Sequence, residues 1–224
     1  MTGKITEIFS SIQGEGIYFG ERQVFVRFAE CNLSCSYCDT KFNIFREYEA
    51  EELFSSLESF GKGFHSVSFT GGEPLLQKDF LKESMRLVKQ GGYRTYLETN
   101  GTLPEALEAV IDDTDIIAMD IKLPSSGSSS VGYWQEHRDF LKISADKDVF
   151  VKAVISLSTT KEDFVRMLDL LKTMNYSGIL VLQPNSFDSA DSLEEKLAIF
   201  KKYGENHPFP ICAIAQMHKV LGVR

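Results

Sequence analysis

Short apolar segments alternate with helical segments along most of this chain, and that alternation restricts the fold more than any other feature of the sequence. Seven apolar or β-branched runs have the length of buried strands. They cover residues 5–9, 24–28, 67–69, 95–97, 116–121, 149–155 and 179–182. Strands separated by helices predict parallel pairing with right-handed crossovers. Because there are about six strand-helix units, the sequence predicts an α/β fold with a partial, TIM-like barrel of parallel strands and flanking helices.

Two of the predicted helices have a capping box at their start. In this motif a Ser or Thr caps the first turn, and a Glu three residues later caps the Ser or Thr in return. Thr159 with Glu162, and Ser192 with Glu195, have this spacing. The sequence therefore predicts helices that begin at these two boxes. The Ser/Gly-rich residues 125–130 are expected to form a surface loop before another helix.

The size, composition and charge of the chain favour an enzyme with a small-molecule substrate. Its 224 residues, 43% of them hydrophobic, are enough for one barrel, and we expect a single domain over residues 1–224. The sequence contains neither an apolar run of about eighteen residues nor a secretory leader, which predicts no membrane span and a cytoplasmic protein. The formal net charge is −8 and the 24 basic residues are dispersed, so nucleic acid is not an expected partner.

Three of the four cysteines, Cys31, Cys35 and Cys38, form a C-x3-C-x2-C loop. A 4Fe-4S cluster takes four ligands, so three thiolates leave one iron free to bind a small molecule. The alternative is structural zinc, which prefers four donors in two separated pairs. The fourth cysteine, Cys212, lies far away in an apolar run, where a free cysteine is usually a small core residue. The spacing therefore favours an iron-sulphur cluster over zinc, and the Gly-Gly-Glu-Pro run at 71–74 strengthens this prediction.

The candidate motifs follow directly after predicted strands. The cysteine loop follows the run 24–28, residues 70–73 follow the run 67–69, residues 98–101 follow the run 95–97, and residues 183–186 follow the run 179–182. In parallel α/β sheets the active site lies at the carboxyl ends of the strands. We therefore expect these segments to surround one site.

The motifs resemble those of a known superfamily. The cysteine loop, with Tyr37 ahead of its last thiolate, and the Gly-Gly-Glu-Pro run resemble the radical S-adenosylmethionine (SAM) superfamily. Within it, the Ser-Ile-Gln-Gly-Glu-Gly run at 11–16 and the Cys-Asp-Thr run at 38–40 resemble the 7-carboxy-7-deazaguanine synthases of the deazapurine, or queuosine, pathway. The resemblance covers nearly the whole chain and implies a barrel of the radical SAM type.

The resemblance implies a carbon-nitrogen lyase that contracts a ring. Such enzymes convert 6-carboxy-5,6,7,8-tetrahydropterin to 7-carboxy-7-deazaguanine with release of ammonia. The implied cofactors are a 4Fe-4S cluster, SAM and Mg²⁺. The implied partners are an electron donor of the flavodoxin or ferredoxin type and a second copy of the chain in a homodimer.

The resemblance also implies site residues, and no catalytic residue beyond the cofactor. The cluster ligands are Cys31, Cys35 and Cys38, and the magnesium ligand is Thr40, although residue chemistry alone favours its neighbour Asp39. The implied SAM contacts are Tyr37, Cys38, Asp39, Gly71, Gly72, Pro124, Ser125, Gln183, Pro184, Asn185 and Ser186. The implied substrate contacts are Ile12, Gln13, Gly14, Glu15, Arg27 and Thr70. Many members have Ser-Pro-Lys where this chain has Lys-Leu-Pro-Ser-Ser at 122–126.

Two of these residues have a chemical reason to bind a carboxypterin. A carboxylate such as Glu15 accepts a pair of N–H donors from an aminopyrimidine edge, and the planar fork of Arg27 suits a carboxylate. The alternative for Arg27 is an outward-facing strand residue that meets water. The four histidines are scattered and are expected to have no role. The segment 216–224 is expected either to close over the substrate or to form a packed tail.

Two rival functions remain open from the sequence. A glycyl-radical activating enzyme has the same cysteine loop, but it has no reason to carry the residues 13–16 and Arg27. A non-catalytic iron-sulphur or zinc module that binds a partner is the rival from another class. The sequence indicates neither the natural electron donor nor whether the product serves tRNA modification or a secondary metabolite.

Overall fold

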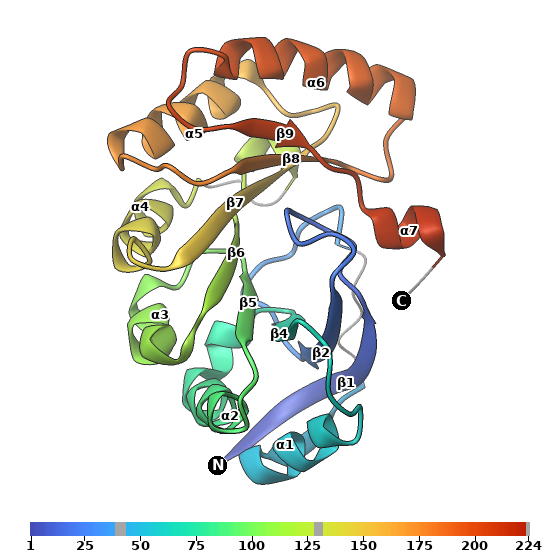
Figure 1. The fold of residues 1–224 in the computed structure, drawn as a ribbon. Coiled ribbons are helices and arrows are strands. Elements are labelled where there is room, and N and C mark those ends of the chain that lie inside the picture. The colour runs from blue at the N-terminus through green and yellow to red at the C-terminus, as the bar shows by residue number, and fades with distance from the viewer. Residues whose placement is uncertain (39–43, 128–131, 223–224) are drawn as a thin grey trace.

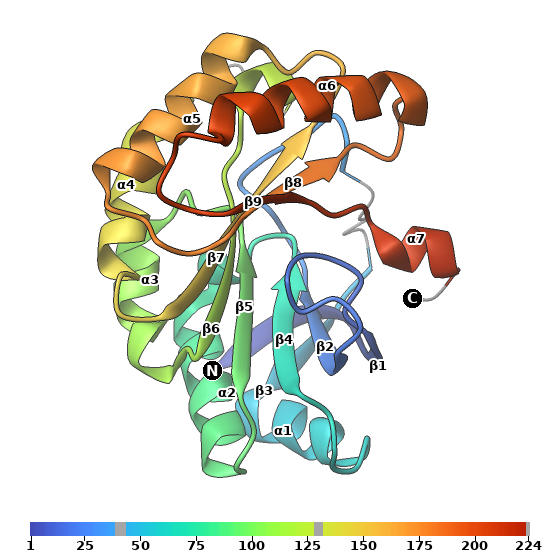
Figure 2. The same ribbon diagram turned by 45° about the horizontal axis from the view of Figure 1, so that its top comes forward.

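The computed structural model describes residues 1–38, 44–127 and 132–222, and its centre is one curved, mostly parallel sheet (Figure 1). The strands are β1 (Thr2–Ile12), β2 (Arg22–Phe28), β3 (Arg46–Glu49), β4 (Ser66–Gly71), β5 (Thr95–Thr99), β6 (Ile116–Asp120), β7 (Asp148–Ile155), β8 (Leu180–Pro184) and β9 (Ile211–Ala213). Their order across the sheet is β3-β1-β2-β4-β5-β6-β7-β8-β9. The two edges do not pair with each other, so the predicted incomplete barrel is confirmed (Figure 2).

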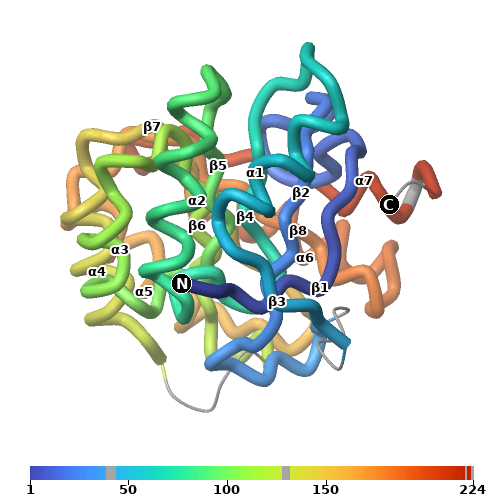
Figure 3. Tube along the Cα trace, turned by 90° about the horizontal axis from the view of Figure 1, so that it is seen from below, coloured from blue at the N-terminus to red at the C-terminus, as the bar shows by residue number. Residues whose placement is uncertain are grey.

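Helices cover the convex face of the sheet. The α-helices are α1 (Ala50–Glu58), α2 (Lys78–Gln90), α3 (Pro104–Val110), α4 (Trp134–Ile143), α5 (Lys161–Thr173), α6 (Ala190–Gly204) and α7 (Met217–Leu221), and the 3-10 turns are η1 (Pro74–Gln77), η2 (Ile111–Asp113) and η3 (Pro124–Ser126). The short α7 lies apart from α3, α4 and α5, on the side of β1 and β2 (Figures 1 and 3). Among the described residues, no helix is long and apolar enough to cross a membrane.

The core has two layers because alternate strand residues face opposite sides of the sheet. On β7, Val151 packs in the larger cluster between sheet and helices, whereas Phe150 belongs to a smaller cluster on the concave face. Residues 13–21, which join β1 to β2, carry Tyr18 onto this smaller cluster. Gly16 is required there, because it has a φ of +67° and an added Cβ would lie 2.4 Å from the ring of Phe150. The connecting segment therefore fills the concave side near the amino ends of the strands.

The first strand departs from the parallel pattern that the sequence predicted. β1 pairs antiparallel with both β2 and β3, while the remaining pairs are parallel. Only residues 13–21 join β1 to β2, and a parallel connection needs a crossover of a dozen or more residues. The edge strands β3 and β9 were not predicted: the first is polar, with the sequence REYE, and the second has three residues. Cys212 lies on β9 and is partly exposed.

Both predicted helix starts are wrong: α5 is capped one residue later than predicted, and the N-cap of α6 lies three residues earlier, at Ser189. The cap of α5 is Thr160, whose hydroxyl accepts a hydrogen bond from the backbone N–H of Asp163 at 3.3 Å. Thr159 does not cap the helix, because its Oγ1 accepts a hydrogen bond from the backbone N–H of Ser156 at 2.9 Å. Helix α6 begins at Ala190, so Ser192 lies inside it. Neighbouring Ser and Thr residues compete for the cap, and the winner depends on the turn that precedes the helix.

Replacing Phe164 with alanine is expected to destabilise the fold by about 3 to 5 kcal/mol, the usual cost of a Phe-to-Ala cavity. Phe164 of α5 is fully buried and stacks on Phe200 of α6 with ring centroids 4.1 Å apart. Urea unfolding followed by circular dichroism measures the loss. The matched control is Ile199→Ala, because Ile199 is 45% exposed on α6 and should cost less than about 1 kcal/mol. Equal losses in the two variants would contradict the expected docking of α5 on α6.

Candidate active site

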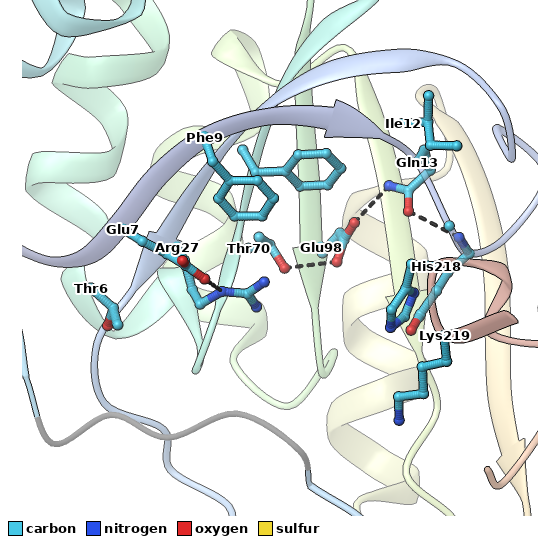
Figure 4. Close-up of a pocket in the computed structure, with 13 residues that line it drawn as sticks. Thr6, Glu7, Phe9, Ile12, Gln13, Arg27, Thr70, Glu98, His218 and Lys219 are labelled. Carbon is cyan, nitrogen blue, oxygen red and sulfur yellow. Dashed lines mark hydrogen bonds and ion pairs between the residues drawn. The ribbon is translucent and has the colours of Figure 1, made fainter. Parts of the chain in front are cut away.

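A cavity of about 560 Å³ lies between the first two strands, the segment that joins them and α7 (Figure 4). All six residues predicted as substrate contacts line it: Ile12, Gln13, Gly14, Glu15, Arg27 and Thr70. The other lining residues are Thr6, Glu7, Phe9, Phe25, Glu98, His218 and Lys219. The fold therefore brings all the predicted substrate residues to one cavity, together with Glu98 of β5.

Glu98 organises the inner wall of this cavity. Its Oε2 accepts a hydrogen bond from Thr70 Oγ1 at 2.7 Å, and its Oε1 accepts one from Gln13 Nε2 at 2.8 Å (Figure 4). Gln13 Nε2 also donates to Gln23 Oε1 at 3.0 Å, and Gln13 Oε1 accepts the backbone N–H of Glu15 at 3.0 Å. The amide of Gln13 is thus held at both ends, and it fixes the start of the loop that carries Glu15.

Arg27 is a wall residue of the cavity rather than a solvent-facing strand residue. Its Nε donates to Glu7 Oε1 at 2.6 Å, and each side chain is 24% exposed. Its guanidinium lies 5.6 Å from the ring centroid of Phe9, which stacks on Phe25. The terminal nitrogens of Arg27 point along the cavity toward Thr70 (Figure 4). A partly buried guanidinium whose two terminal nitrogens point into the cavity suits a planar anion.

Glu15 is already paired inside the protein. Its carboxylate accepts hydrogen bonds from Lys152 Nζ and, at 2.7 Å, from Gln216 Nε2. Burial alone would raise the pKa of Glu15, but Lys152 and Gln216 outweigh it and lower that pKa to about 2. The side chain is 19% exposed and lines the cavity. Glu15 is therefore an ionised acceptor at neutral pH.

The C-terminal segment forms one side of the cavity. The backbone N–H of Met217 donates to the carbonyl of Gly14 at 2.9 Å, and a Cβ added to Gly14 would lie 2.6 Å from His218. His218 and Lys219 line the cavity, so one of the four histidines that were expected to have no role lies at the candidate site. The described part of the segment packs on Gly14, as a packed tail would, and it lines the cavity.

A second cavity, of about 200 Å³, adjoins the first and holds the cysteine loop. The predicted cluster and cofactor residues that line it are Cys31, Cys35, Tyr37, Cys38, Gly71, Gly72 and Gln183. The predicted residues that do not line it are Pro124, Ser125, Pro184, Asn185 and Ser186. Ser125 faces the start of α5, because its Oγ accepts the backbone N–H of Thr160 at 3.0 Å. The predictions for Asp39 and Thr40 fall outside the described residues.

The three thiols fit a cluster better than a single metal ion. Burial raises the pKa of Cys31 and of Cys35, so without a bound metal these thiols favour the protonated form. Within residues 1–38, 44–127 and 132–222, no three His, Cys, Asp or Glu side chains converge on a point that could hold one ion. A mononuclear zinc site needs such convergence, whereas a 4Fe-4S cluster takes each thiolate at a different corner.

The Gly-Gly-Glu-Pro turn is locked against the cysteine loop and against β5. Gly71 has a φ of +120°, and a Cβ added to Gly72 would lie 1.7 Å from the carbonyl oxygen of Glu30. Glu73 is fully buried and accepts hydrogen bonds from Thr99 Oγ1 at 2.9 Å and from the backbone N–H of Asn100 at 2.8 Å. Burial raises the pKa of Glu73 to about 7, although these donors oppose the rise. The turn therefore presents its backbone at a fixed place in the second cavity.

Two buried acceptors in the second cavity lack a hydrogen-bond donor among the described residues. They are Oδ1 of Asp120, at the end of β6, and Oε1 of Gln183, near the end of β8. An unpaired buried acceptor costs about 1 to 3 kcal/mol, so these atoms are expected to meet a donor from a bound molecule. The hydroxyl and amino groups of an adenosyl cofactor are donors of this kind, so the residues of this cavity fit SAM.

Among the cavity residues to which the sequence assigned no contact, Glu98, Lys152 and Glu7 hold the predicted substrate residues in place. Glu98 lies at the carboxyl end of β5, a position that predicts a site, but no chemical pattern distinguished it from its neighbours. Lys152 is a lone charge within the apolar run 149–155, and that contrast was a usable signal, because lysine is rarely buried without a partner. Glu7 lies two positions along β1 from Phe9, and alternation along the strand places both toward Arg27.

The partial barrel, the cysteine loop and the glycine turn together define a radical SAM protein. A sequence model of the family described as the radical SAM superfamily matches residues 26–172, more than half of the chain. The fold is also similar to that in the crystal structure of QueE from Escherichia coli, with a TM-score of 0.64 and 21% identity over 95% of this chain and 94% of that one. The prediction of a radical SAM fold is confirmed.

Relatives that are similar in sequence show the family within this superfamily. The chain is 36% identical over 204 residues to the 7-carboxy-7-deazaguanine synthase of Geobacter sulfurreducens, across 81% of each chain. It is 35% identical to the protein of that name from Methanothermobacter thermautotrophicus, in an alignment 250 positions long that includes gaps and covers 100% of this chain and 99% of that one. The chain therefore belongs to the 7-carboxy-7-deazaguanine synthase family of the radical SAM superfamily.

Proposed function

We propose that this protein converts 6-carboxy-5,6,7,8-tetrahydropterin to 7-carboxy-7-deazaguanine with release of ammonia. The observation that carries the proposal is the contact between the two cavities. Four side chains line both of them: Glu15, Arg27, Thr70 and Glu98. A substrate in the first cavity would therefore lie directly beside a cofactor held in the second, which a radical reaction requires because the reacting atoms must be adjacent.

The first cavity supplies partners for each polar part of a carboxypterin. Glu15 accepts the paired N–H groups of the aminopyrimidine edge, and Arg27 binds the carboxylate. The stacked rings of Phe9 and Phe25 give the cavity a flat apolar wall, which suits a planar heterocycle. A volume of about 560 Å³ lies within the range for small-molecule sites.

The second cavity supplies the place for the cofactors. Cys31, Cys35 and Cys38 would hold three irons of a 4Fe-4S cluster, and Gly71 and Gly72 would bring the backbone close to the methionyl part of SAM. When both are bound, they supply a 5'-deoxyadenosyl radical, chemistry that no side chain provides. The protein keeps the two cavities adjacent and covers the first one with its C-terminal segment, which limits access of water to a reactive species.

Three further features of the family are part of the proposal. Magnesium would be held by Thr40 together with substrate oxygens, the electron donor would be a flavodoxin or ferredoxin, and the protein would act as a homodimer in the cytoplasm. Magnesium prefers hard oxygen ligands and keeps several waters, so one protein ligand is sufficient. Assays with and without added Mg²⁺, after treatment with a chelator, test the metal separately from the reaction.

The direct test is an anaerobic assay of the cluster-replete protein with the carboxytetrahydropterin, SAM and dithionite. We expect 7-carboxy-7-deazaguanine and ammonia in equal amounts. Deoxyadenosine without the deazaguanine would remove this function and favour another radical SAM reaction, such as the activation of a glycyl-radical enzyme. A protein whose visible absorption does not bleach with dithionite would support the zinc module instead.

Replacing Glu98 with glutamine is expected to lower kcat/KM about tenfold, or about 1.4 kcal/mol. The change removes the negative charge and turns one acceptor oxygen into an NH₂ group, so the hydroxyl of Thr70 must accept where it donated before, or Gln13 faces a donor. Gln13 and Thr70 thereby lose their charge-assisted hydrogen bonds to a carboxylate, and the inner wall of the cavity is held less firmly for the substrate. Steady-state kinetics measure the effect, with Glu105→Gln as control because Glu105 is exposed on α3. Equal kinetics in both variants would exclude Glu98 from the substrate wall.

A further inference from the structure

Lys152 occupies an unusual position for a lysine. It lies in the middle of β7, where its backbone pairs with Asp120 of β6 and Val181 of β8. The side chain faces the concave side of the sheet, as do its neighbours at two positions along the strand, Phe150 and Val154. Its side chain is only 14% exposed. A lysine buried to this extent is stable only with anionic partners.

Four charged side chains follow one another across the concave face with alternating sign. Glu15 pairs with Lys152, Lys152 Nζ lies 3.7 Å from Asp120 Oδ2, and Asp120 Oδ2 lies 2.9 Å from Lys122 Nζ. The ammonium of Lys122 in turn lies 5.5 Å from the ring centroid of Tyr37 in the cysteine loop. The row is neutral as a whole, and it runs from the wall of the first cavity to the wall of the second.

Lys152 lies between Glu15, at the boundary of the two cavities, and Asp120 in the second cavity. Glu15 lines both cavities, whereas Asp120 and Lys152 line only the second. Burial opposes the charge on Lys152, but Glu15 and Asp120 outweigh burial and raise the pKa of Lys152 above its ordinary value. Without Lys152, Glu15 would be a largely buried carboxylate whose only hydrogen-bonding side chain is the neutral amide of Gln216.

We propose that Lys152 is a positioning residue that holds the Glu15 carboxylate in place and in its acceptor form at the boundary between the two cavities. The proposal rests on the proposed function, in which Glu15 accepts the paired N–H groups of the pterin. A protonated Glu15 would present a donor to that edge and lose one of the two hydrogen bonds. Lys152 does not need to touch the substrate for this role.

The charged and titratable groups that face Glu15 come from several elements. They are Lys152 of β7, His218 of α7, Tyr96 and Glu98 of β5, and Asp120 of β6. Lys152 is the group that hydrogen-bonds to Glu15 as a cation, while His218 contributes the smallest of its favourable interactions. Loss of Lys152 therefore leaves Glu15 with burial as its main influence, and burial raises the pKa of a carboxyl group.

The test compares Lys152→Met with Lys152→Arg in binding of 6-carboxypterin, an unreactive probe, between pH 5.5 and 8.5. The ratio of variant to wild-type Kd cancels the titration of the probe, which is the same in all three experiments. For Lys152→Met we expect this ratio to rise as the pH falls through the new pKa of Glu15, by about tenfold in total, the cost of one lost hydrogen bond. For Lys152→Arg we expect a ratio within about threefold of one at every pH, because arginine keeps the cation.

A ratio for Lys152→Met that does not change with pH would overturn the proposal while leaving the proposed function intact. Failure of the wild-type protein to bind the probe and to form product would remove the proposed function instead. The role of Lys152 is then decided without a ligand, by a carbon-13 NMR titration of the Glu15 carboxyl group assigned with Glu15→Gln. A midpoint at about pH 6 or above in Lys152→Met supports the proposal, and a lower midpoint overturns it.

Discussion

Replacing Cys35 with alanine abolishes turnover and leaves the fold in place. This is the largest effect expected of any single change, because two thiolates do not hold a 4Fe-4S cluster that needs three from the protein. The cysteine loop contributes none of its thiols to the hydrophobic core, which is built from strands and from helices α1 to α6. The fold should therefore persist, with the far-ultraviolet circular dichroism of the wild-type apoprotein.

Two measurements separate a functional role of Cys35 from a structural one. Visible absorption reports the cluster, and deoxyadenosine formation reports cleavage of SAM. The matched control is Cys212→Ala, since Cys212 is a free cysteine on β9, outside both cavities, and should keep both signals. A Cys35→Ala protein that keeps a dithionite-sensitive band, or one that loses its circular dichroism, would contradict the expected arrangement.

The parallel part of the barrel was predictable because its strands are buried on both faces. β6 is buried on both faces and has the sequence IIAMD, so its apolar run is continuous and distinct in the sequence. The polar β3 lies at an edge, where only one neighbour pairs with it and no apolar run is required. The strand β1 was predicted from its apolar run, but its antiparallel direction was not, because the length of a connection decides the direction and the apolar run itself does not.

The candidate site was predictable only where a local motif carries the chemistry. The cysteine loop and the glycine turn are such motifs, and their residues line one cavity. Glu98 reaches Gln13 across 85 positions of sequence, and Lys152 reaches Glu15 across 137. These pairs arise because β5 and β7 face the segment that follows β1 across the concave side. No spacing in the sequence indicates them, although a single lysine in an apolar strand signals that a buried partner exists.

Replacing Arg27 with alanine is expected to weaken substrate binding by about 2 to 5 kcal/mol. Arg27 is partly buried, and its Nε is already used by Glu7, so the terminal nitrogens remain for a ligand carboxylate. Removal of the guanidinium has two effects on the cavity wall that Arg27 and Glu7 form. The substrate carboxylate loses its planar partner, and the Glu7 carboxylate, which faces the same cavity, loses the ion pair with Arg27 and repels the substrate. The Michaelis constant should therefore rise by at least about thirtyfold.

The control for Arg27→Ala lies on the same strand. Arg22 is exposed at the start of β2 and donates to Ser10 Oγ, so Arg22→Ala removes a guanidinium from β2 without touching either cavity. The double variant Glu7→Gln with Arg27→Ala separates the two effects, because it removes the repulsion and leaves only the lost contact. Partial recovery of the Michaelis constant in the double variant is the expected result. An unchanged Michaelis constant in Arg27→Ala would place the substrate carboxylate elsewhere.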